Sequence, residues 1–294
     1  APSTETQGAT TAANYLIHAY AKPHCSMKAT TRALLVLQRG LVLWFTFMVA
    51  AVFRDGVTWL VAAREGVTGY FTRAGVVLDA PRHVWLDCQC VAGVYVAGPL
   101  AALVLGALGW TYYRRHRPNL PWQKYVVFWL GGWLLLHFTA GWLAGVLSRT
   151  GLWFVWSWMY LPLPVMYSAS GLLLVPLVYL GWRQRRHLFR TVGMSGQDIE
   201  AGRFRALWLY GYGIPFIVLI ILLTVWYAPA PAAQIHALIL AAGGWLLTLP
   251  MLWSGRFLST KAHTFPPKEP FSPRPVPLLW LLAAGFVLLF LLLN

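Results

Sequence analysis

Charged side chains are scarce in this sequence: Asp, Glu, Lys and Arg account for 11% of its 294 residues, whereas 59% are hydrophobic. Soluble domains contain roughly 25% charged residues, so this scarcity excludes an ordinary soluble protein. The apolar stretches are continuous and do not alternate with polar residues, which excludes a transmembrane β-barrel. We therefore predict an all-α protein, a polytopic bundle of transmembrane helices over residues 33–294. A polar, disordered tail over residues 1–32 precedes it, and we expect Met27 to lie at or near the natural start.

Cysteines and catalytic motifs are also missing. Three thiols (Cys25, Cys88 and Cys90) cannot build a disulfide framework, and no CxxC occurs. The signatures HExxH, GxSxG, GxxxxGK[ST] and GxGxxG are absent, and no acidic residue lies in the core of a predicted span. These absences favour a non-enzymatic packing, assembly or scaffold component, and we predict no cofactor beyond the transition metal considered below.

Seven segments are long and apolar enough to cross a hydrocarbon core of about 30 Å. They are residues 33–53, 91–112, 125–147, 165–182, 207–228, 233–253 and 277–293. Of the 23 Lys and Arg, 18 fall in alternate gaps between these segments and five in the others. The positive-inside rule then puts the N-terminus in the cytoplasm and the C-terminus outside, and we expect the bacterial inner membrane. The net charge of +15 is explained by this sidedness, so we expect no nucleic acid partner.

The uncharged run over 152–182 is too long for one crossing and too short for two. Two spans would also reverse the charge pattern of all later gaps, so we predict one span, over 165–182. The Trp-rich stretch that ends at Tyr160 then lies at the outer interface, and Pro162 and Pro164 turn the chain into the span. The alternative is one long, tilted and kinked helix.

The gap over 54–90 is the only outer segment of any size, and its charges nearly cancel. Val57, Leu60, Val61 and Arg64 follow a helical period. We expect one or two amphipathic helices there, lying on the outer surface of the membrane.

The stretch DAPRHVWLDCQC, residues 79–90, is the best candidate for a metal site. His83, Asp87 and Cys90 have the spacing i, i+4, i+7 and share one face of a helix. Imidazole, carboxylate and thiolate all bind zinc and other transition metals. A capped helix start at the outer interface explains the same residues without a metal, because three ligands on one helix are seldom enough.

His137 is the one ionisable residue near the middle of a predicted span, and such residues commonly mark functional sites. The alternative is a neutral imidazole that is hydrogen-bonded between helices, for instance to Ser168, Ser170 or Tyr167. His236 lies near the outer end of its span. At a rise of 1.5 Å per residue the two histidines should differ by roughly 12 Å in depth, which argues against a shared haem.

Small and basic residues form two further sets. The first is expected to allow close helix packing: Gly98, Ala102, Gly106, Gly141 and Gly145. The second is expected to contact anionic lipid headgroups on the cytoplasmic side: Arg183, Arg185, Arg186 and Arg190. Contact with other membrane subunits is a further possibility for the glycine-rich faces.

The pentapeptide GGWLL occurs at 131–135 and again at 243–247, in spans that run in opposite directions. Spans two to four and five to seven could therefore form an inverted three-plus-three repeat, as in many transporters. A small-solute transporter or channel is thus the alternative to the scaffold hypothesis. A membrane-embedded metal-dependent enzyme, using the residues of the metal site or His137, is the third.

Overall fold

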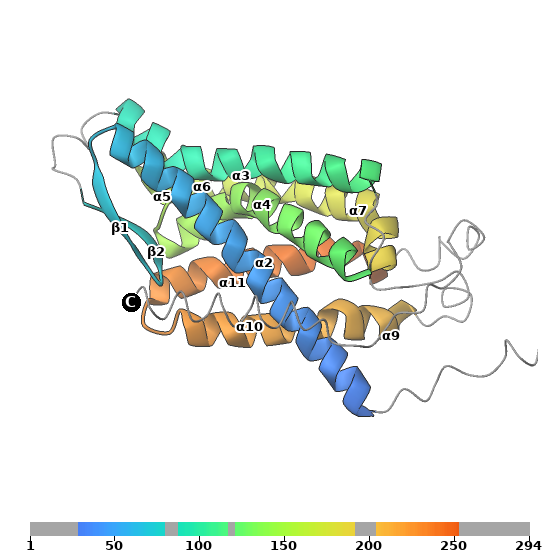
Figure 1. Ribbon diagram of the computed structural model, residues 1–294. Coiled ribbons are helices and arrows are strands. Elements are labelled where there is room, and N and C mark those ends of the chain that lie inside the picture. Colours follow the sequence, from blue (N-terminus) through green and yellow to red (C-terminus); the bar gives the residue numbers. More distant parts are fainter. Residues whose placement is uncertain (1–28, 80–87, 117–120, 192–203, 253–294) are drawn as a thin grey trace, which may run out of the picture.

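The computed structural model describes residues 29–79, 88–116, 121–191 and 204–252. Its longer helices are α2 (Ala29–Arg64), α3 (Cys88–His116), α4 (Pro121–Ser148), α6 (Leu163–Leu172), α7 (Leu174–Thr191), α10 (Ile214–Trp226) and α11 (Pro231–Thr248). Shorter elements are strands β1 (Thr68–Thr72) and β2 (Gly75–Asp79), helices α5 (Trp153–Trp158) and α9 (Phe204–Trp208), and the π-helix η2 (Leu209–Gly213). The helices lie side by side, and α2 crosses the others diagonally (Figure 1).

This is the helical, multi-pass membrane architecture that the sequence predicts. Within the described residues, six candidate spans are long and apolar enough to cross a membrane. They correspond to the first six predicted spans, while the seventh, over 277–293, lies outside the described residues. Helix α4 is the most enclosed of these spans, because 67% of its most apolar 18-residue stretch is buried. The span formed by α6 and α7 is the least enclosed, and only 17% of the corresponding stretch is buried. Helix α4 is therefore the central helix, with α6 and α7 at the periphery.

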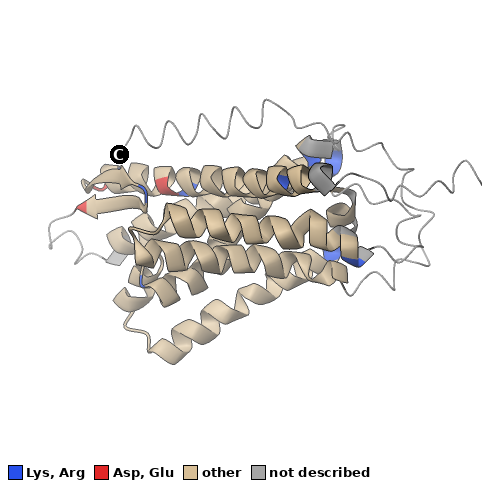
Figure 2. Cartoon of the chain, turned by 90° about the horizontal axis from the view of Figure 1, so that it is seen from below, with Lys and Arg blue, Asp and Glu red and all other residues tan. Residues whose placement is uncertain are grey.

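The two ends of the bundle differ in charge. Strands β1 and β2 lie at one end, which we call the hairpin end, together with the Asp and Glu residues of the described part of the chain, Asp55, Glu65 and Asp79 (Figure 2). At the opposite end, which we call the basic end, α3 closes on Arg114 and Arg115 and α7 carries Arg183 and Arg185. The positive-inside rule assigns the basic end to the cytoplasm, and this sidedness remains a prediction.

The expectation of surface helices in the gap over 54–90 is wrong for the part that the structure describes. Helix α2 continues through Arg64, and β1 and β2 then pair as an antiparallel hairpin, with Thr72 opposite Gly75. The helical period that we noted belongs to the continuation of the first span. At 1.5 Å per residue, the 36 residues of α2 measure about 54 Å, longer than a perpendicular crossing requires. Its diagonal path accounts for part of the excess.

Residues 152–182 contain a short helix, a turn and one span. Helix α5 is followed by extended backbone at Pro162, with φ −67° and ψ 145°, and α6 starts at Leu163. Pro164, which lacks an N–H, lies in the first turn of α6, where no helical donor is needed. Pro176 withholds the bond that the Leu172 carbonyl would accept in a continuous helix, so the span has a break between α6 and α7. The chain is thus not one uninterrupted helix, while the interfacial position of α5 remains a prediction.

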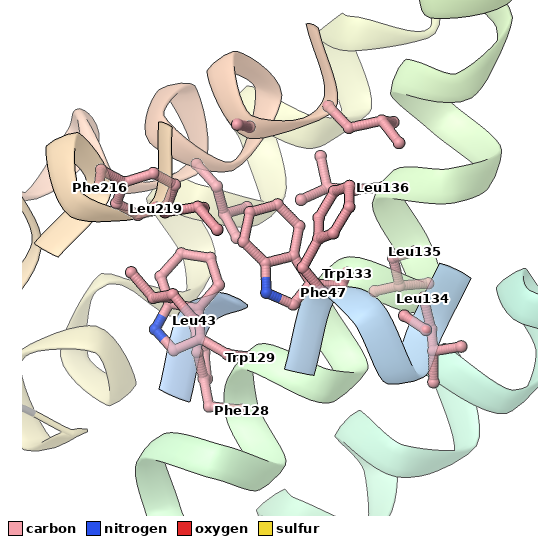
Figure 3. Packing of buried hydrophobic residues seen from close by; sticks show 14 of the residues in the cluster. Leu43, Phe47, Phe128, Trp129, Trp133, Leu134, Leu135, Leu136, Phe216 and Leu219 are labelled. Atoms are coloured by element: carbon pink, nitrogen blue, oxygen red, sulfur yellow. The ribbon is translucent and has the colours of Figure 1, made fainter. Parts of the chain in front are cut away.

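Aromatic side chains fill the centre of the bundle (Figure 3). Trp133 contacts Phe47 of α2 edge to face, with 5.2 Å between ring centroids, and Trp129 contacts Phe216 of α10 at the same distance. These four side chains are at most 2% exposed. Edge-to-face packing is favourable for aromatic quadrupoles, so the rings join α2, α4 and α10 into one core.

The two GGWLL copies lie against each other where α4 meets α11. A Cβ on Gly244 would come within 2.7 Å of the Trp133 ring, and one on Gly243 within 3.0 Å of Leu136. Glycine therefore allows the two helices to approach closely at this point. Close packing accounts for the repeated pentapeptide, and the inverted repeat remains a prediction.

Pro215 interrupts the fifth span and leaves carbonyl groups that neighbouring helices satisfy. Because Pro215 has no N–H, the Gly211 carbonyl lacks its usual helical donor, and the backbone widens into η2. The Tyr125 hydroxyl donates to the Gly211 carbonyl at 3.3 Å, and Arg39 donates to the Tyr210 carbonyl at 3.1 Å. Irregular backbone at membrane depth needs such partners, and here α2 and α4 supply them.

Candidate functional site

A charged and polar cluster joins three helices near the hairpin end. Arg54 and Asp55 come from α2, His137 from α4 and His236 from α11. One guanidinium nitrogen of Arg54, Nη1, lies 3.3 Å from Nδ1 of His137 and 3.3 Å from Nε2 of His236. Nε and Nη2 of Arg54 contact Oδ1 of Asp55 at 2.7 and 2.6 Å. We call these four residues the Arg–His cluster.

The cluster is largely enclosed by the chain. The side chains of Arg54 and Asp55 are 18% and 14% exposed, and His137 is 2% exposed. A buried charge is stable only when a partner compensates for its lost hydration, and each of these two charges has the other. Because such residues inside a membrane bundle are costly, they are the leading candidates for a functional site.

The hydrogen bonds determine the protonation of both imidazoles. A guanidinium can only donate hydrogen bonds, so Nδ1 of His137 and Nε2 of His236 must both be unprotonated and accept with their lone pairs. His137 is therefore neutral with its proton on Nε2, and His236 is neutral with its proton on Nδ1. The Nδ1–H of His236 faces the hydroxyl oxygens of Thr150 at 3.2 Å and Ser148 at 3.4 Å.

A tight turn after α4 brings Thr150 to His236. Arg149 and Gly151 have left-handed backbones, with φ of 55° and 54°. The turn returns the Thr150 hydroxyl to within 2.7 Å of the Ser148 hydroxyl. A Cβ on Gly145 would lie 2.9 Å from the Thr150 carbonyl oxygen, so glycine leaves room for this turn.

Among the described residues, Nε2 of His137 has no hydrogen-bond partner, although it is buried. The partners that we considered from sequence do not bind it. Within the described residues, the Ser170 hydroxyl is itself buried without a partner, and both Ser168 and Tyr167 are exposed. The imidazole is neutral and joined to another helix, as the non-functional alternative supposed, but its partner is Arg54. A buried N–H without an acceptor costs about 1–3 kcal/mol.

The expected separation in depth between His137 and His236 is wrong, because both contact the same nitrogen atom. The expectation treated the spans as parallel rods with level ends, and it ignored the reach of the two imidazole side chains along the bundle. The argument from depth against a shared haem therefore fails. Arg54 nevertheless occupies the space between the two ring nitrogens, which leaves no place there for a haem iron.

The predicted metal site is mostly outside the described residues, since His83 and Asp87 lie in the segment 80–87. Cys90 is a buried cysteine, 8% exposed, near the start of α3. It packs with Ala62, Val67 and Val94 in a small apolar cluster beneath the hairpin. Within the described part of the chain no group of three or more His, Cys, Asp or Glu side chains is placed to hold a metal. The metal site thus remains a prediction.

Three of the five small residues singled out for packing, on α3, lie where that helix approaches α2 or α4, or are buried. Gly98 faces the backbone of α2 at Arg54, and Ala102 on the same helix is fully buried. A Cβ on Gly106 would lie 3.0 Å from the Gly131 carbonyl oxygen of α4. Gly141 and Gly145 face the turn that follows α4: Leu152 is 3.8 Å from a Cβ on Gly141, and the Thr150 carbonyl oxygen 2.9 Å from one on Gly145. Helix packing by these two glycines remains a prediction.

Two of the four arginines expected at lipid headgroups have described side chains. Arg183 is exposed, and its Nη1 donates to the Tyr179 hydroxyl at 3.4 Å. Arg185 stacks over the Trp182 ring at 4.5 Å, and its Nη1 donates to the Trp182 carbonyl at 2.7 Å. The side chains of Arg186 and Arg190 lie outside the described part. Headgroup contact by all four remains a prediction.

Sequence reasoning missed the two charged members of the cluster. Arg54 and Asp55 directly follow the predicted first span and were assigned to a solvent-exposed gap. The available signal was the pattern of helical spacing that continues past them, from Val57 to Arg64. An ion pair inside a continuing helix is a candidate for burial, whereas the same pair in a surface loop is not.

Searches against protein families, curated proteins and solved structures found nothing that matches this chain.

Proposed function

We propose that the protein is a non-enzymatic component of the bacterial inner membrane that packs and assembles with other membrane subunits through its helices. Its basic end would face the cytoplasm and contact anionic lipid headgroups. What supports this proposal best is that the described core is filled from within the chain. Phe47, Trp129, Trp133 and Phe216 occupy the centre of the bundle.

The Arg–His cluster supports the same proposal. All three nitrogens of the Arg54 guanidinium already have partners from the chain, and the charge of Arg54 is paired with that of Asp55. An arginine used in this way joins α2, α4 and α11 and has few donors left for an anionic solute. The polar residues of the described bundle thus serve helix association.

The face of α6 and α7 is the best candidate for contact with another subunit. This span is the least buried of the six, and its exposed apolar side chains include Leu172, Val175 and Val178, at 68%, 62% and 44% exposure. Such a surface must face lipid or protein.

Photo-crosslinking tests the assembly proposal. A photoreactive amino acid in place of Val175 on α7 should give a discrete protein adduct in native membranes. The same substitution at Val225 of α10, which is 71% exposed, serves as the control and should give lipid adducts only. Lipid adducts alone from both positions would contradict assembly through α6 and α7.

A transporter or channel is the second candidate, and the Arg–His cluster is the observation that favours it. Buried charges and the free Nε2–H of His137 are features of solute and proton pathways. Proteoliposomes distinguish the two candidates. Our proposal predicts no saturable solute uptake and no proton flux above that of empty vesicles. Flux that is lost in His137→Gln would favour the transporter.

A further inference from the structure

The sharing of one guanidinium by two imidazoles makes the Arg–His cluster sensitive to protons. Each imidazole accepts a hydrogen bond from Nη1 of Arg54, so the lone pair that would bind a proton is already in use. A proton on either ring would replace an acceptor with a second donor and place two positive charges side by side. Arg54 would then have to leave the ring that was protonated.

The other charges near the two rings do not remove this conflict. The two imidazoles interact electrostatically with Arg54 and with each other. Arg54 in turn interacts with Asp55 and with Tyr227, which follows α10. The Tyr227 hydroxyl is a phenol, which stays protonated over the range in which imidazoles titrate. Ser148 and Thr150, which face His236, are neutral hydroxyls. Asp55 is the one carboxylate in this set, and its Oδ1 is bound to Arg54.

The same ion pair lies directly beneath the turn of the β1–β2 hairpin. A Cβ on Gly75 would come within 2.7 Å of Oδ2 of Asp55, so the backbone of the turn rests on the carboxylate. The hairpin has a second contact with α2, in which Nε1 of Trp59 donates to the Gly69 carbonyl at 3.0 Å. A two-stranded hairpin is marginally stable by itself. Its protection from solvent exchange therefore depends on docking against α2.

We propose that His137 and His236 form a proton-binding site that controls the docking of the hairpin. At neutral pH both rings are neutral, Arg54 holds Asp55 in place, and the hairpin rests on the ion pair. When a proton binds, Arg54 is displaced, Asp55 moves with it, and the turn of the hairpin is released. The released state binds more protons than the docked state, so docking is favoured as pH rises and lost as pH falls. This site is separate from the proposed assembly face on α7.

Hydrogen exchange of the full-length protein in detergent, read by mass spectrometry over residues 68–79, tests the proposal. After correction for the chemical exchange rate, these amides should exchange about tenfold faster or more at about pH 5 than at about pH 8, because imidazoles that are released from the contact with Arg54 titrate between these values. We call this increase in exchange rate between about pH 8 and about pH 5 the exchange step. Peptides from the basic end of α4 should not show it. Equal protection at both pH values would overturn the proposal.

Glutamine variants identify the groups responsible. The double variant His137→Gln/His236→Gln keeps polar side chains that do not titrate, so the step should disappear. The control His187→Gln changes a histidine that packs on Tyr113, far along α7 from the hairpin, and it should keep the step. If the double variant does not fold, Arg54→Met provides the test, because its hairpin should exchange rapidly at both pH values. A full step in any variant that lacks the pair or Arg54, or its loss in His187→Gln, would overturn the assignment.

Discussion

Replacing Arg54 by Met should lower the free energy of unfolding by about 3 kcal/mol. The change leaves the Asp55 carboxylate without its partner in a site where that side chain is only 14% exposed. Removing one member of a buried pair typically costs 3–5 kcal/mol, and the residual exposure here puts the expectation at the lower end. Both imidazoles also lose the donor that faces them. Unfolding in mixed micelles, titrated with a denaturing detergent, measures the loss.

Two controls separate the loss of this pair from a general effect of removing an arginine. Arg64→Met removes a charge from the exposed end of the same helix and should change stability by less than about 0.5 kcal/mol. The double variant Arg54→Met/Asp55→Leu removes both charges and should be more stable than Arg54→Met alone, since no carboxylate is left unpaired. If Arg54→Met were as stable as Arg64→Met, Arg54 could not be part of a buried ion pair.

Replacing Gly98 by Ala should destabilise the protein by about 1–3 kcal/mol through overpacking. The added methyl group would overlap the Arg54 carbonyl oxygen and the Thr58 hydroxyl, both on α2. Neither can move freely, because the carbonyl is main chain and the Thr58 hydroxyl donates to it at 3.1 Å. Helix α3 must therefore move away from α2 at Arg54, the residue whose side chain contacts the other members of the Arg–His cluster.

Gly93→Ala on the same helix is the matched control. A Cβ at Gly93 has no atom within 4 Å, so the change should be neutral, or favourable by up to about 1 kcal/mol through helix propensity. Thermal unfolding in detergent, followed by circular dichroism, compares the two variants. Equal stabilities would mean that α3 does not approach α2 closely at Gly98.

The spans could be predicted from the sequence because a membrane helix needs only length and apolar composition. The turn at Pro162 could also be predicted, because proline fixes φ and removes a donor whatever surrounds it. In both cases the cause lies within about 20 consecutive residues.

The hairpin could not be predicted in this way. Its two-residue loop is Arg73–Ala74, without the Asn-Gly or Asp-Gly that marks such turns. Gly75, at φ 112°, supplies the necessary left-handed backbone just after the loop. The strands are short, and a tertiary contact with α2 decides that they pair.

The Arg–His cluster depends on distances between helices that are far apart in sequence. His137 follows Arg54 by 83 residues, and His236 follows it by 182. Sequence reasoning identified His137 as the functional candidate but did not connect it with Arg54. Which partner a buried histidine meets depends on helix crossing angles and side-chain reach, and local periodicity determines neither.

The most direct test of the account is ¹⁵N NMR of labelled histidines, with His137 and His236 assigned from their glutamine variants. At neutral pH both rings should be neutral, with the proton of His137 on Nε2 and that of His236 on Nδ1. In Arg54→Met this opposite pattern should be lost. A doubly protonated ring at either position, or the same nitrogen protonated in both, would contradict an arginine shared between two imidazoles.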